Sequence, residues 1–197
     1  MTSKLYSPLA IALLIVFVTG ASSLSLARPF HHPFGELREY HRHWLAVCPD
    51  VHKPAAQSEY QTNCWASTWT GNEDGTFTGS FPGNRLSVHR NRKTGQLAIT
   101  FVSASVENID PKRSVTVKFS DGRVSKYPYG TSVTPNRNSG NEYTFAIQTD
   151  TNNLVRAMKA GNHVTITMPT KGTDKPMFFS LQGLKSALGF LKKYATR

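Results

Sequence analysis

The sequence predicts a mainly β fold: an antiparallel β-sandwich or partly open barrel of about eight strands, with a short late helix and a C-terminal helix packed on it. Apolar and polar residues alternate in short runs, turn residues recur about every ten positions, and helical spacing occurs only late in the chain. No internal repeat or interdomain linker is visible, so residues 44–197 are expected to form one domain.

The expected strands follow from alternation, because successive side chains of a strand point to opposite faces. Val115, Val117 and Phe119, for example, would share one face. The turns are rich in glycine and polar residues, as between hairpin strands. The expected strands are 43–48, 62–70, 84–90, 96–106, 114–119, 123–127, 142–147, 163–168 and 177–181.

The late helix is predicted by apolar residues at helical spacing between a capping residue and a glycine. Asp150 or Thr151 would be the N-cap, Leu154 and Met158 would face the core, and Gly161 would end the helix. The chain then returns as a strand.

The C-terminal segment "FFSLQGLKSALGFLKKYATR" passes from a strand into an amphipathic helix. Gly183 lies at the junction, where a residue without a side chain allows a tight passage. Neither Ser180 nor Ser186 has the G-x-S-x-G setting of a nucleophile. We interpret the junction as architecture.

Residues 1–27 are expected to be a signal peptide. Lys4 precedes an apolar run, Leu9–Val18, which is shorter than the roughly twenty residues that span a bilayer, and Ser25 and Ala27 fit a cleavage site. The protein is therefore expected to be periplasmic or secreted, with outer-membrane association as an alternative.

Cys48 and Cys64 are the only cysteines. An even count in an exported chain favours a disulfide. A metal site formed by both cysteines, His52 and one more ligand is the alternative, although the spacing matches no common zinc pattern.

Residues 28–43 are predicted to be a flexible, His-rich polar arm. Its four histidines raise a metal hypothesis, but a mobile arm that gains charge below about pH 6.5 is the favoured interpretation. We therefore expect no metal and no cofactor. The four histidines are His31, His32, His41 and His43.

The chain is strongly basic, with 23 Lys and Arg against 12 Asp and Glu and a formal net charge of +11. Such a charge attracts anionic partners, and export favours envelope lipid, lipopolysaccharide or host glycan over nucleic acid. Cations crowd two expected hairpins, and they would form one basic stripe if the hairpins were neighbours. The candidate anion-binding residues are Arg85, Arg90, Arg92, Lys93, Arg113, Lys118, Arg123 and Lys126.

Catalysis is not expected. Acidic residues are few and lie mostly in turns, so the paired carboxylates of a glycosidase are not apparent. His89 and His163 lie in or beside strands without a local triad motif. Besides a binder, the sequence allows an inhibitor or accessory subunit of an envelope enzyme acting through the glycine-rich loop 70–84, or less readily a hydrolase.

Four motifs together resemble the invasion-associated locus B family of exported bacterial proteins: "HWLAVC", "NCWAST", "LVRAMKAGNHVTITM" and "FFSLQGLKSALGFL", within residues 44–195. The resemblance implies a periplasmic or outer-membrane protein with a role in bacterial entry into host cells, hence in virulence, and no catalytic residues. A second cysteine pair, which members often carry ahead of the late helix, is absent from this chain.

Overall fold

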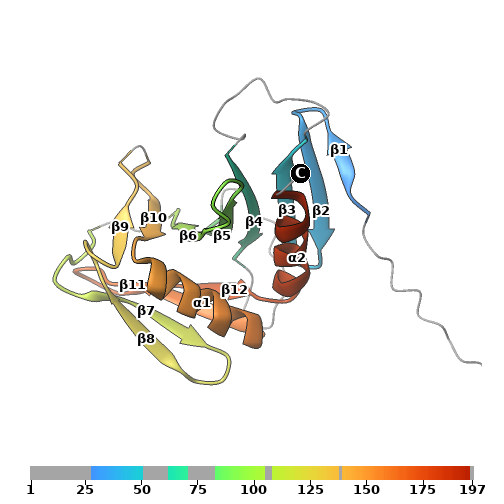
Figure 1. The fold of residues 1–197 in the computed structure, drawn as a ribbon. Coiled ribbons are helices and arrows are strands. Elements are labelled where there is room, and N and C mark those ends of the chain that lie inside the picture. The colour runs from blue at the N-terminus through green and yellow to red at the C-terminus, as the bar shows by residue number, and fades with distance from the viewer. Residues whose placement is uncertain (1–27, 51–61, 71–82, 105–107, 138, 196–197) are drawn as a thin grey trace, which may run out of the picture.

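The structure is a computed structural model, and it describes residues 28–50, 62–70, 83–104, 108–137 and 139–195. In these residues the chain forms twelve strands and two helices, and every strand pair is antiparallel (Figure 1). This confirms the predicted mainly β fold, with two open sheets rather than a closed barrel. The expected signal peptide and most of the loop 70–84 lie outside the described residues.

Two sheets of unequal size make up the fold. The larger sheet has, in order, β1 (Phe30–His32), β2 (Glu36–His41), β3 (Trp44–Pro49), β4 (Asn63–Trp69), β5 (Arg85–Asn91), β6 (Leu97–Val102), β10 (Glu142–Phe145) and β9 (Val133–Pro135). The smaller sheet has β12 (Lys175–Ser180), β11 (His163–Met168), β7 (Ser114–Phe119) and β8 (Val124–Pro128).

The predicted flexible arm over residues 28–43 is wrong, because β1 and β2 of the larger sheet lie in it. Their polar side chains are matched in pairs: His31 Nδ1 lies 2.5 Å from a buried Asp50 carboxylate oxygen. Glu36 accepts a hydrogen bond of 2.7 Å from Arg38 Nε. A polar strand is stable here because its charges have partners inside the sheet.

The late helix, α1 (Gln148–Ala160), begins earlier than predicted. Its N-cap is Ile147, with no side-chain capping bond, while the Thr151 hydroxyl donates to the Phe145 carbonyl instead. The predicted stop at Gly161 is confirmed.

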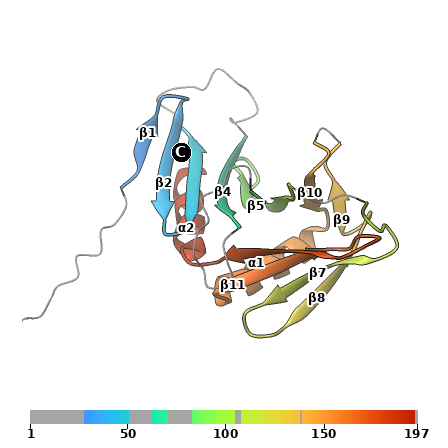
Figure 2. The same cartoon turned by 180° about the vertical axis from the view of Figure 1, so that it is seen from behind.

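The C-terminal helix, α2 (Leu184–Ala195), packs on β2, β3, β4 and β5 of the larger sheet. Leu184 and Leu191 are buried in the same hydrophobic core cluster as Trp44. Full burial of one such leucine contributes about 1.5–3 kcal/mol. Helix α1 packs on β6 and β10 of the same sheet, and Figure 2 shows the smaller sheet in front of α1 when the molecule is seen from behind.

The junction between β12 and α2 is held against the β2–β3 turn. Gly183 has φ +98°, and a Cβ atom there would lie 1.8 Å from the His41 carbonyl oxygen. Trp44 Nε1 donates a hydrogen bond of 3.0 Å to the Ser180 carbonyl in the same region. The glycine is therefore required by close packing, as its architectural interpretation predicts.

Cys48 and Cys64 form a disulfide that joins β3 to β4, with an S–S distance of 2.06 Å. This confirms the predicted disulfide, and a disulfide is typical of proteins outside the reducing cytoplasm. None of the helices in the described residues is both long and apolar enough to span a bilayer.

Candidate anion-binding groove

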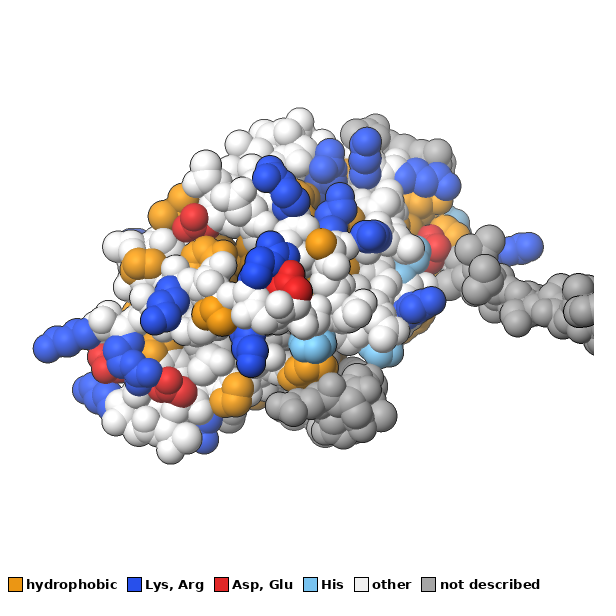
Figure 3. Space-filling view, turned by 90° about the horizontal axis from the view of Figure 1, so that it is seen from below, with side chains coloured by type: hydrophobic (Ala, Val, Ile, Leu, Met, Phe, Trp, Pro, Cys, Tyr) orange, Lys and Arg blue, Asp and Glu red, His pale blue; other side chains and the backbone are white. Residues whose placement is uncertain are grey.

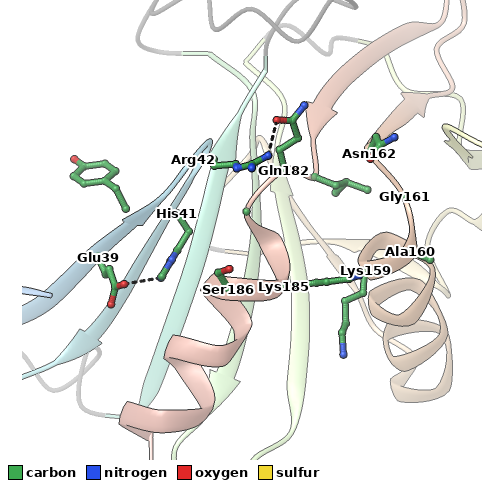
Figure 4. Close-up of a pocket in the computed structure, with 13 residues that line it drawn as sticks. Glu39, His41, Arg42, Lys159, Ala160, Gly161, Asn162, Gln182, Lys185 and Ser186 are labelled. Atoms are coloured by element: carbon green, nitrogen blue, oxygen red, sulfur yellow. Dashed lines mark hydrogen bonds and ion pairs between the residues drawn. The ribbon is translucent and has the colours of Figure 1, made fainter. Parts of the chain in front are cut away.

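A groove of about 830 Å³ lies where the β2–β3 turn, the end of α1 and the start of α2 meet (Figure 4). Three elements far apart in the sequence thus form its walls. The close contact of Gly183 with the turn fixes the position of the first turn of α2 relative to β2.

Three exposed cations line this groove: Arg42 from the turn, Lys159 from the last turn of α1 and Lys185 from the first turn of α2. The Arg42 guanidinium donates to the Gln182 amide oxygen at 3.4 Å. In the described part of the chain no carboxylate forms an ion pair with any of the three. Figure 4 shows Lys185 extending from α2 toward the end of α1 that carries Lys159.

Lys185 is at an unfavourable place for helix stability. The N-terminal end of a helix carries partial positive charge, so acidic residues are stabilising there and basic residues are not. The first turn of α2 has no acidic residue. Helix stability therefore does not explain a lysine at this position, whereas anion binding does.

The first turn of α2 borders the groove, which Gly183, Lys185 and Ser186 line. Leu184 N donates to the Leu181 carbonyl and Ala187 N to the Gly183 carbonyl. By helix geometry the N–H groups of Lys185 and Ser186 have no intrahelical acceptor, and Gly183, as the N-cap, has no side chain to offer one. Such N–H groups bind anions readily.

Glu39 and His41 form the opposite wall, with His41 Nε2 3.7 Å from a Glu39 carboxylate oxygen. Burial lowers the pKa of His41 below its ordinary value of 6.5, and Glu39 offsets only part of this effect. His41 is therefore neutral at pH 7. The groove then holds the three positive charges against the one negative charge of Glu39.

The elements that form the groove carry further cations. Figure 3, a view from below, shows Lys and Arg side chains gathered over the upper half of the view with few acidic side chains among them. Lys185 and Lys192 lie two turns apart on α2 and so point the same way. We define the basic face as the exposed cations of the β2–β3 turn, α1 and α2, which are Arg42, Arg156, Lys159, Lys185, Lys192 and Lys193.

The cations predicted from the sequence lie on two different sheets. The first hairpin, β5–β6, belongs to the larger sheet and the second, β7–β8, to the smaller one. The two hairpins are therefore not neighbours within one sheet, and a single basic stripe stays a prediction.

Three of the predicted arginines are paired with carboxylates. Arg113 forms a two-bond pair with Asp174, at 2.6 and 2.8 Å. Arg123 Nε lies 2.7 Å from Asp121. Arg85 lies 3.7 Å from Glu142.

The other five predicted cations have varied settings. Arg92 Nε donates to the Ala195 carbonyl at 3.3 Å, at the end of α2, and Arg90 packs on Gly95. Lys93, Lys118 and Lys126 are exposed. Anion binding by these residues stays a prediction.

The two strand histidines have structural partners. His89 Nε2 lies 3.0 Å from the Thr100 hydroxyl, and burial lowers the pKa of His89 below 6.5. The ring of His163 packs on Phe178. In the residues that the structure describes, no group of three His, Cys, Asp or Glu side chains is arranged to hold a metal ion.

Sequence reasoning missed Arg42, Lys159 and Lys185 as a set, because they are brought together only by the tertiary fold. One signal was available. A lysine two residues after a junction glycine lies in the first turn of the following helix, where it opposes the helix dipole.

No protein-family model matches this chain, and neither a curated protein nor a solved structure matches it.

Proposed function

We propose that the protein is an exported, non-catalytic binder of anionic envelope or host-surface components, acting through the basic face rather than through the two predicted hairpins. The observation that carries this proposal is Lys185, an exposed cation in the first turn of α2 that forms no ion pair with any residue the structure describes. Lysines 159, 192 and 193 lie in the last turns of their helices, where the dipole favours them. Lys185 has no such structural explanation.

Export to the periplasm or beyond is supported by the disulfide and by the signal-like residues 1–27. Membership of the invasion-associated locus B family is also a proposal. Three placements support it: the first two motifs form β3 and β4 under the disulfide, the third forms the end of α1 and β11, and the last forms β12, which pairs with β11, and α2, which packs on β3 and β4.

A pair of matched triple variants tests the location of binding. Arg42→Gln/Lys159→Gln/Lys185→Gln removes three charges from the basic face, and Lys112→Gln/Lys118→Gln/Lys126→Gln removes three exposed charges from the β7–β8 hairpin and the residues just before it. Each cation near an anionic surface contributes about 1 kcal/mol. We therefore expect the first variant to bind vesicles containing anionic lipid on the order of a hundredfold more weakly, and the second to bind like the wild type.

Retention of the wild type on heparin that falls steeply with salt would support binding to anionic components. Equal losses in both variants would show that only net charge matters. Salt-insensitive capture of a single envelope enzyme would instead favour the inhibitor or accessory role.

A further inference from the structure

We infer that the groove between the β2–β3 turn, α1 and α2 is a binding site for a phosphate monoester group, carried by a sugar or by a lipid headgroup. This inference rests on the proposed function and deepens it: the basic face attracts a polyanion, and the groove holds one defined group of it. The evidence is the groove itself, its three cations and its charge balance.

The cations approach the groove from three separate elements: Arg42 from a turn, Lys159 from α1 and Lys185 from α2. A planar carboxylate offers two oxygens in one plane, whereas a phosphate monoester offers three strong acceptor oxygens around a tetrahedral centre. Donors placed on several sides of a groove therefore suit the tetrahedral group better. Arg42 adds a planar fork of donors, which fits phosphate oxygens.

The charge balance favours the same ligand. With His41 neutral, the three cations and Glu39 leave a surplus of two positive charges along the groove. A phosphate monoester carries about −1.5 to −2 at pH 7. A sulfate monoester carries a single charge and would leave part of the surplus unmatched.

Arg42 has an unusual backbone. It lies in the tight turn between β2 and β3 with φ +54°, a left-handed conformation that non-glycine residues rarely adopt. Two contacts with the junction before α2 hold the turn in place. Gly183 packs against the His41 carbonyl, and His43 N donates a hydrogen bond to the Gln182 carbonyl. The guanidinium is therefore attached to a backbone whose direction is set by α2.

Titration of the full chain, labelled with ¹⁵N, tests the site directly. Inorganic phosphate and then glucose 6-phosphate are added at constant ionic strength, and glucose 6-sulfate serves as the singly charged comparison. We expect saturable shifts of the amide signals of Lys185, Ser186 and Asn162, which all line the groove. Glucose 6-sulfate should bind several-fold more weakly than glucose 6-phosphate. Arg42→Gln and Lys185→Gln should each weaken phosphate binding on the order of tenfold.

The matched control is Lys126→Gln, which removes one exposed lysine of β8 outside both the groove and the basic face. It should change the affinity less than about twofold, as expected for a distant exposed charge. Equal losses in Lys185→Gln and Lys126→Gln, or shifts spread over all cations, would overturn the inference. The amide spectra of the variants also report whether they fold.

Two ligands separate the possible sources of the group. Vesicles of phosphatidylcholine with phosphatidate present a lipid phosphate, and glucose 6-phosphate presents a sugar phosphate. Loss of vesicle binding in Lys185→Gln identifies the lipid, whereas binding of the sugar phosphate alone identifies the glycan. The inference is overturned if the protein binds neither the phosphatidate vesicles nor glucose 6-phosphate.

The outcome is distinguishable from failure of the proposed function. If the wild type is retained on heparin but phosphate causes no localised shifts, the groove inference fails and the proposed function stands. If the wild type is retained on neither heparin nor anionic vesicles, the proposed function fails.

Discussion

Positive charge is arranged in two different ways on this molecule. On the hairpins, Arg113 and Arg123 are held by Asp174 and Asp121. Along the groove, Arg42 and Lys185 have no acidic partner among the described residues. An exposed carboxylate partner competes with an external ligand for its cation. The number of cations in a segment therefore does not by itself locate a binding surface.

The largest expected effect on stability comes from Gly183→Ala, which disrupts the packing of α2 against the β2–β3 turn that forms the groove. The new Cβ would overlap the His41 carbonyl oxygen, and the φ of +98° would be strained. We expect a loss of more than about 3 kcal/mol in the free energy of unfolding, measured by urea denaturation.

Gly189→Ala in the same helix is the matched control, because nothing lies within 4 Å of its Cβ position. It should stabilise the protein by about 0.5–1 kcal/mol, through the higher helix propensity of alanine. Equal stability of the two variants would contradict the close packing of the junction.

Asp174→Asn breaks the comparison from the hairpin side. It frees Arg113, while the amide oxygen can still accept the bond from Thr170 N. We expect binding to anionic vesicles to change less than about twofold, because the proposed function assigns contact with the anionic surface to the basic face and not to this hairpin. The double variant Arg113→Gln/Asp174→Asn, which has the wild-type net charge, should bind like the wild type. About fivefold tighter binding of Asp174→Asn, from about 1 kcal/mol per added surface cation, would show that pairing with Asp174 is what keeps Arg113 from binding.

The strands that could be predicted from the sequence are those whose inward residues are apolar. In β7, Val115, Val117 and Phe119 alternate with polar residues and are buried as expected. Strand β2 has no such pattern, because Glu36 is buried in an ion pair with Arg38. The two residues are close in sequence, but the burial of Glu36 depends on its tertiary neighbours, which the sequence pattern does not reveal.

The candidate site was less predictable than the fold for a related reason. Arg42, Lys159 and Lys185 belong to three elements and meet only because α2 lies on β3 and β4 beside α1. The expected hairpins were local features, so their cations could be grouped from the sequence. Local grouping found charge, but it could not find the acidic partners Asp174 and Glu142, which come from distant segments.

Acid should destabilise the protein through its buried histidines. Burial holds the pKa values of His41 and His89 below 6.5, so near this pH the unfolded chain binds more protons than the folded one. The free energy of unfolding should therefore fall as pH decreases through 6.5. Thermal unfolding between pH 8 and pH 5 measures this. His89→Gln, which can still bond to Thr100, should make the decrease shallower, and an equal slope would contradict the assignment.

Lys185→Glu has the smallest expected effect on stability, and it separates stability from function most clearly. Lys185→Glu places an acidic residue in the first turn of α2, where the helix dipole favours it, so unfolding should require about 0.3–1 kcal/mol more. The same change reverses one of the three positive charges of the groove, and phosphate binding should be lost. A residue kept for packing or helix stability would behave in the opposite way, losing stability when replaced. Chemical denaturation and the phosphate titration of one variant therefore decide between the two roles: a less stable protein that still binds phosphate would show that Lys185 is structural.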